Sequence, residues 1–113
     1  MRPIPRSLLP HTIKLHKEIN EDAWGDGEPD EGQIIEYVRM EPSAKIVRDK
    51  SGAEIQLAAT LFYDCKNSLP GNVSFVVDDI ITFNGQKHKV KVVEPLYDRR
   101  KLHHYELGLI KDG

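Results

Sequence analysis

Polar and apolar residues alternate along most of the chain, which is the pattern of strands that bury one face and expose the other. No helical period longer than two turns is present, although a short helix could form near Arg6–Leu9 between flanking prolines. The alternation predicts strands at Thr12–Ile19, Gln33–Met40, Ala44–Val47, Glu54–Asp64, Ile80–Phe83, Lys87–Val93 and His103–Ile110. We therefore predict an all-β fold, a small β-barrel of about six to eight mostly antiparallel strands with long loops.

Turn signals separate these predicted strands. Asn84-Gly85 favours positive φ at both positions, which a tight type I′ hairpin requires. Asp49–Gly52 predicts a second turn, inside a hairpin that spans Val47–Glu54. Leu69–Asn72 predicts a third turn, and Pro95–Lys101, with its Asp-Arg-Arg-Lys cluster, predicts a loop.

The composition fits one domain over residues 1–113, with an N-terminal arm at 1–11 and an acidic flexible loop at 20–32. The net charge of −2 predicts no avid binding to nucleic acids or membranes through overall electrostatics. The one cysteine, Cys65, cannot form an internal disulfide, which fits a reducing compartment. No apolar run has the length of a signal peptide or a membrane span, so we expect the protein to be made and used in the cytoplasm, or in something assembled there.

The segment Glu18–Glu31 breaks the alternation, because it holds seven carboxylates and no Lys or Arg. Such a stretch repels itself and predicts a mobile loop. The second half of the chain has a basic bias, so copies of the chain could attract one another head to tail. The residues that we predict to contact a partner are Asp22, Trp24, Asp26, Glu28, Asp30, Glu31, Arg48, Asp49, Lys50, Arg99, Arg100 and Lys101. Trp24 either folds back on the barrel or anchors a partner.

No candidate for catalysis or metal binding stands out. Asp22, Asp26 and Asp30 of this loop lie four positions apart, whereas the ligands in the calcium-binding loop of an EF-hand lie two apart. His103 and His104 are strand neighbours, so we expect them to point to opposite faces and not to share one ion. No nucleophile–base pair or phosphate-binding glycine loop is present, so we expect neither an enzyme nor a cofactor. We expect Phe75 and Phe83 to pack in the core, which weakens an alternative interpretation as an OB- or SH3-like module that binds single-stranded nucleic acid or a peptide.

The C-terminal half resembles a known family. The residues that carry the likeness are Phe75–Gly85, Val90–Pro95 and His103–Leu107, preceded by the strand Ala58–Asp64. These segments resemble small head–tail connector proteins of tailed bacteriophages, the head-closure or stopper proteins, which are also called minor capsid proteins in phages of Gram-positive hosts. The resemblance covers roughly residues 33–110.

The resemblance implies a structural virion protein at the head–tail interface. It implies a β-barrel subunit that forms a ring, twelvefold in the expected case, below the portal and adaptor proteins. The ring would receive the tail and help to retain packaged double-stranded DNA, without reading its sequence and without contacting a membrane. From the charge pattern we expect the acidic loop or the Val47–Glu54 hairpin to face the channel or a neighbouring ring, since carboxylates do not hold phosphates.

Overall fold

The computed structural model describes residues 2–17, 32–49 and 51–112. Strands dominate these residues, and the first element is a single 3₁₀ turn where the sequence allowed a short helix. The elements are η1 (Arg6–Leu8), β1 (His11–His16), β2 (Gln33–Pro42), β3 (Ile46–Arg48), β4 (Glu54–Gln56), β5 (Ala59–Asp64), β6 (Ile80–Phe83), β7 (Gln86–Asp98) and β8 (Lys101–Lys111).

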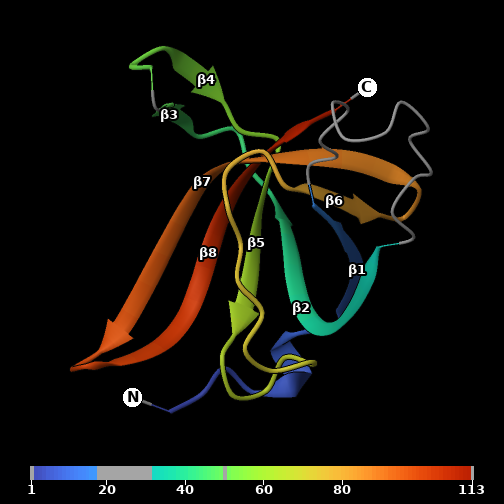
Figure 1. The fold of residues 1–113 in the computed structure, drawn as a ribbon, viewed down its shortest axis with the longest axis vertical. Coiled ribbons are helices and arrows are strands. Elements are labelled where there is room, and N and C mark those ends of the chain that lie inside the picture. The colour runs from blue at the N-terminus through green and yellow to red at the C-terminus, as the bar shows by residue number, and fades with distance from the viewer. Residues whose placement is uncertain (1, 18–31, 50, 113) are drawn as a thin grey trace, which may run out of the picture.

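Six strands form a closed antiparallel barrel, which confirms the predicted fold class. Their order is β1-β2-β5-β8-β7-β6, and the barrel closes where β6 pairs with β1. In that closing pair Leu15 lies opposite Ile81, and both side chains are buried. Figure 1 shows the barrel with β3 and β4 standing beside it as a separate two-stranded hairpin.

The barrel interior is filled by the apolar side of each predicted alternation. Tyr63 anchors its centre, and its ring contacts those of Phe75 and Tyr105 at centroid distances of 5.3 and 6.2 Å. Phe83 is partly buried against the same cluster, so both phenylalanines pack in the core as the sequence predicts. The buried cluster comprises Ile13, Leu15, Ile35, Val38, Met40, Ala59, Leu61, Tyr63, Val73, Phe75, Ile81, Val90, Leu107 and Leu109.

The connection from β5 to β6 is long, and the core holds it in place. The Tyr63 hydroxyl donates to the Pro70 carbonyl at 2.6 Å and accepts from the Val73 amide at 3.3 Å. Val73 and Phe75 insert into the core cluster. Figure 1 shows this connection running alongside β5, so it forms part of the wall that covers the core.

The two predicted hairpin turns are present. Asn84 and Gly85 have φ of 49° and 78°, as the type I′ expectation requires. At the tip of the β3–β4 hairpin the Asp49 carboxylate accepts hydrogen bonds from the amides of Ser51 and Ala53. The Ser51 hydroxyl also donates to this carboxylate, at 2.6 Å, and that side-chain bond is the main cause that lowers the pKa of Asp49.

The expectation of one continuous strand over Glu54–Asp64 is wrong. β4 ends at Gln56 and β5 begins at Ala59, because the chain changes its partner between them. The Leu57 amide donates to the Lys45 carbonyl, while the next amide, that of Ala58, donates to Leu109 in the barrel. The alternation continues through this change of partner, so it gave no sign of the break.

The expectation of a loop over Pro95–Lys101 is also wrong. β7 continues through Pro95 to Asp98 and β8 begins at Lys101, so only a tight turn at Arg99-Arg100 remains. Pairing with β8 overrides the local turn signal, since Pro95 lies opposite Tyr105. Beyond Lys89, β7 pairs with no strand except β8 among the described residues, so Pro95 can be accommodated at a free edge.

Candidate functional site

The predicted contact residues fall into three groups. The residues Asp22, Trp24, Asp26, Glu28, Asp30, Glu31 and Lys50 lie outside the described part of the chain. Arg48 and Asp49 lie at the tip of the β3–β4 hairpin, and Arg99, Arg100 and Lys101 lie at the tip of the β7–β8 hairpin. The two tips are at opposite ends of the molecule in Figure 1, so the structure does not bring these two groups together.

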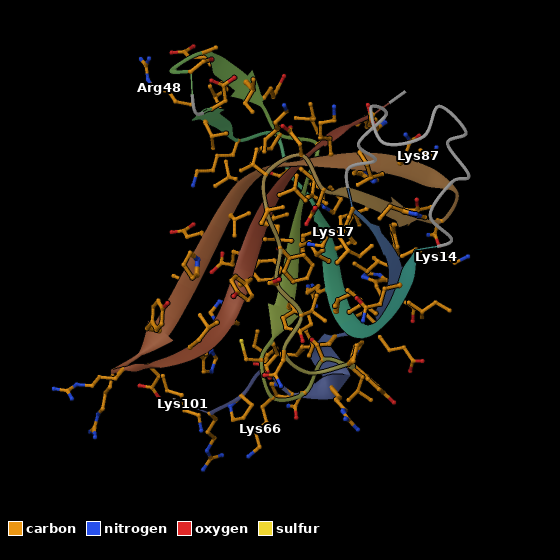
Figure 2. The ribbon with its side chains drawn as sticks, viewed as in Figure 1. Lys14, Lys17, Arg48, Lys66, Lys87 and Lys101 are labelled. Carbon is orange, nitrogen blue, oxygen red and sulfur yellow. The ribbon has the colours of Figure 1, made fainter. Side chains whose placement is uncertain are left out.

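The β7–β8 tip belongs to a larger cationic surface that sequence reasoning missed. Figure 2 shows Lys66, from the connection after β5, at the same end of the molecule as Lys101. Both line one hollow of about 520 Å³, together with Pro3 of the N-terminal arm. We call this surface the basic end and define it by six exposed side chains, those of Arg2, Arg6, Lys66, Arg99, Arg100 and Lys101.

The buried carboxylate of Asp64 fixes the N-terminal arm to this end. Its side chain is fully buried, and it accepts hydrogen bonds from the amides of Ile4, Lys66 and Asn67 at 2.8–3.1 Å. Hydrogen bonds to a carboxylate are stronger than neutral ones. A residue sixty positions from Ile4 therefore sets the path of the arm across the end of β5.

Two further bonds hold the arm in this position. The Asn67 side-chain amide donates to the Ile4 carbonyl at 2.7 Å, and Arg6 Nε donates to the Asn67 carbonyl at 3.3 Å. The Arg6 guanidinium also lies over the Tyr37 ring, 4.4 Å from its centroid. These contacts bring the exposed cations of the arm beside Lys66.

His103 and His104 do not point apart, contrary to our expectation. A bulge in β8 breaks the alternation, because Leu96 pairs with His104 while Tyr97 pairs with Leu102. His103 is therefore left without a partner on β7, and its Nδ1 lies 2.7 Å from His104 Nδ1. The bulge turns the two rings towards each other instead of to opposite faces.

The histidine pair links β8 to the arm. His103 Nε2 lies 2.6 Å from the Arg2 carbonyl oxygen, and His104 Nε2 lies 3.0 Å from Glu106 Oε2. A carbonyl and a carboxylate accept hydrogen bonds only, so both Nε2 atoms must donate. These contacts connect Glu106 on β8 through both imidazole rings to the Arg2 carbonyl of the arm.

Cys65 lines the hollow beside His103 without the properties of a nucleophile. It is partly buried, and burial raises the pKa of its thiol, with the neighbouring Asp64 as the second cause. A raised pKa reduces the thiolate fraction near neutral pH, so the thiol is less reactive than a free cysteine. The hollow is thus suited to contact with a partner rather than to covalent chemistry.

The remaining ionic contacts are structural. Lys17 Nζ lies 2.9 Å from the buried Asp79 carboxylate, and Lys91 Nζ lies 3.2 Å from Asp78. No group of three or more His, Cys, Asp or Glu side chains that could hold a metal ion occurs within residues 2–17, 32–49 and 51–112. The arrangement over these residues offers charge and shape for binding a partner.

Only part of the basic end could be predicted from the sequence. Arg99, Arg100 and Lys101 are adjacent and were recognised, but Arg2, Arg6 and Lys66 are isolated cations far apart in the chain. Tyr97, on the same hairpin, is 58% exposed and was not predicted as a contact residue. The long pairing between β7 and β8, which places Tyr97 there, is not visible in the alternation.

No helix in the described residues is long and apolar enough to cross a membrane. Searches of curated proteins and of solved structures found no match. Residues 5–109 match a family described as minor capsid protein, a match that includes both hairpins and all of the barrel except the last two residues of β8. The chain therefore belongs to the minor capsid protein family, and its role is that of a structural component of a bacteriophage particle.

Proposed function

We propose that this protein is a head–tail connector subunit of the head-closure, or stopper, type. Its copies form a ring, with twelve as the expected number, between the portal or adaptor proteins above and the tail below. The ring helps to retain packaged DNA, contacts that DNA without sequence specificity, and receives the tail. Assembly of the ring takes place in the host cytoplasm, and the mature position is the head–tail interface of the virion.

The observation that carries this proposal is the placement of two hairpins at opposite ends of one closed barrel (Figure 1). The closed barrel pairs its strands around the full circle, which gives a rigid body. The β3–β4 hairpin extends from one end and the β7–β8 hairpin from the other. A subunit of this shape can contact one neighbour above and another below, as a connector between two assemblies must.

The charge distribution supports a channel position. The Glu18–Glu31 segment holds seven of the eighteen carboxylates of the chain and none of its sixteen Lys and Arg residues. The rest of the chain is therefore net positive. A segment with this charge would not hold phosphates, so DNA could slide past it. We propose that this segment or the β3–β4 hairpin, with Arg48 and Asp49 at its tip, faces the channel or a neighbouring ring.

The alternative of a binding module for nucleic acid or peptide has less support. Phe75 is 5% exposed and Phe83 packs against the core, so neither ring offers a stacking surface for bases. Lys91, which could have lined a positive groove, is paired with Asp78. The family match favours a structural role without enzymatic activity.

The test is to locate the protein in particles of the phage that encodes it. We expect cryo-electron microscopy of virions that carry a tagged copy to show added density in a ring at the neck. A phage with a stop codon in this gene should produce filled heads that lose their DNA and do not join tails. Density spread over the head shell, or tailed infectious particles without the protein, would contradict the proposal.

A further inference from the structure

We infer that the basic end of one copy binds the acidic segment Glu18–Glu31 of a second copy. This inference rests on the proposed ring and names the contact between its neighbouring subunits. The contact is heterologous, because two different surfaces of the same chain meet. Head-to-tail contacts of this kind close into a ring when the rotation between subunits divides a full turn.

The basic end has the properties of a surface built for an anionic partner. Its six cations come from the arm, the connection after β5 and the β7–β8 tip, and all six side chains are exposed. The carboxylates that line its hollow are Asp64 and Asp98. Asp64 is buried and accepts three backbone amides, so it bonds the arm instead of facing the partner. Cation density on one surface, held by buried bonds, favours a partner with several carboxylates.

Hydrogen bonds hold the N-terminal arm so that its two cations, Arg2 and Arg6, belong to the basic end. Asp64 bonds the Ile4 amide, and His103 bonds the Arg2 carbonyl. Arg2 and Arg6 flank the first of these bonds in the sequence, so the arm cannot leave without removing both cations from the basic end. The buried hydrogen bonds thus preorganise the surface, which reduces the entropy that is lost on binding.

The acidic segment belongs to the same chain but joins it on the other side of the barrel. It follows the end of β1 and precedes β2, where Leu15 pairs with Gln33. Figure 1 places these strand ends on the side of the barrel away from the β7–β8 tip. Both ends of the segment are held on that side, whereas a second copy can present its basic end there directly.

Pairing of strand edges is a weaker way to join copies. The outer edge of β7 beyond Lys89 pairs with no other strand of the described chain. However, this edge contains Pro95, which lacks an amide hydrogen, and proline at an edge disfavours pairing with a second chain. We therefore favour a contact between the basic end and the acidic segment, which have complementary charges, over the pairing of strand edges.

Two charge-reversed variants test the inference. Variant A carries Arg99→Glu and Arg100→Glu, and variant B carries Asp26→Lys, Glu28→Lys and Asp30→Lys. Variant A lowers the charge of the six-residue basic end from +6 to +2, and variant B changes the charge of the acidic segment from −7 to −1, so each variant binds its own copies more weakly. In an equimolar mixture the unchanged basic end of B meets the unchanged acidic segment of A, so A and B pair through the wild-type contact.

We expect sedimentation velocity at about 50 mM salt, up to about 1 mM protein, to show self-association of the wild type. The apparent Kd should rise at least about tenfold in each variant alone, and the mixture should return to within about threefold of the wild type. A control with the same charge change elsewhere, Lys14→Glu with Lys111→Glu, should associate like the wild type. Circular dichroism checks that all variants fold.

Several outcomes would overturn the inference. A wild type that stays monomeric under these conditions would do so, as would an unrestored mixture or a control as weak as variant A. A labelled DNA duplex tests the competing partner by fluorescence anisotropy. If variant A loses duplex binding but keeps self-association, the basic end faces DNA and the inference is wrong. None of these results depends on where the protein lies in the virion, so the proposed connector position stands or falls separately.

Discussion

Leu57 packs its side chain directly over Gly108, at the point where the chain leaves the β3–β4 hairpin and enters the barrel. A Cβ atom on Gly108 would lie 2.9 Å from Leu57 Cδ1 and 3.2 Å from Val92 Cβ, so the glycine makes room for both. Leu57 is buried, although it lies between β4 and β5 and belongs to neither strand. This contact therefore connects the hairpin to the barrel wall.

Gly108→Ala should destabilise the protein by about 1–3 kcal/mol, because overpacking forces Leu57 or Val92 to move. The measurement is the free energy of unfolding from urea titration. Gly71→Ala is the matched control, since nothing lies within 4 Å of its position and its φ is not positive, and it should change stability by less than about 0.5 kcal/mol. Equal effects of the two substitutions would show that the close contact is not what matters.

Asp64→Ala should cost about 3 kcal/mol, because the amides of Ile4, Lys66 and Asn67 would lose their acceptor in a buried site. Urea unfolding gives the total loss, and hydrogen exchange should locate it in the arm. Asp49→Ala is an informative control, since Asp49 also accepts several bonds but is only partly buried at a hairpin tip. A similar loss for both would contradict the role assigned to burial.

His103→Ala should loosen the arm without unfolding the barrel. The variant removes the bond to the Arg2 carbonyl and leaves the Asp64 bonds in place. We expect hydrogen exchange of residues 2–8 to become at least about tenfold faster, while exchange in β5 and β8 changes little. Tyr97→Ala, a truncation of an exposed side chain on the same hairpin, should leave exchange in the arm unchanged. Unchanged exchange in the His103 variant would show that the histidine does not restrain the arm.

Cys65 should react slowly with a thiol reagent at neutral pH. Burial raises the pKa of its thiol, so at any given pH near 8 the folded protein holds less thiolate than unfolded chain does. The rate of alkylation, followed by mass spectrometry from pH 7 to 10, should therefore rise at higher pH in the native protein than in urea. A native rate that reached its midpoint at the same or a lower pH would contradict this prediction.

The raised pKa values of buried groups also predict that the protein loses stability at high pH. Burial raises the pKa of Tyr63 and Tyr105 as well as that of Cys65, so each group holds its proton more tightly when folded. The resulting stability is fully present below the unfolded pKa values, about 8.5 for the thiol and about 10 for the phenols, and is lost as the pH rises through the higher folded pKa values. The free energy of unfolding should therefore fall from pH 8 to 11. A flat profile over this range would contradict the shifts.

The fold class and most of the core could be predicted from the pattern of residues along the chain. Alternation with a period of two places Leu61, Tyr63 and Leu107 on the inner face, and this depends only on the geometry of the strand. The Asn84-Gly85 turn followed from local backbone preference alone. The charge of the Glu18–Glu31 segment and of the β7–β8 tip was equally plain, since charge is a property of composition.

The contacts between residues that are far apart in the sequence could not be predicted and are seen only in the folded protein. Alternation does not say which strand a segment pairs with, so the change of partner between Gln56 and Ala59 and the extension of β7 through Pro95 were both missed. The bulge that turns His103 onto His104 depends on register across two strands. Arg2 and Lys66 reach one surface only because the buried carboxylate of Asp64 bonds both the arm and the turn after β5. That contact spans about sixty residues, and no local pattern in the sequence records it.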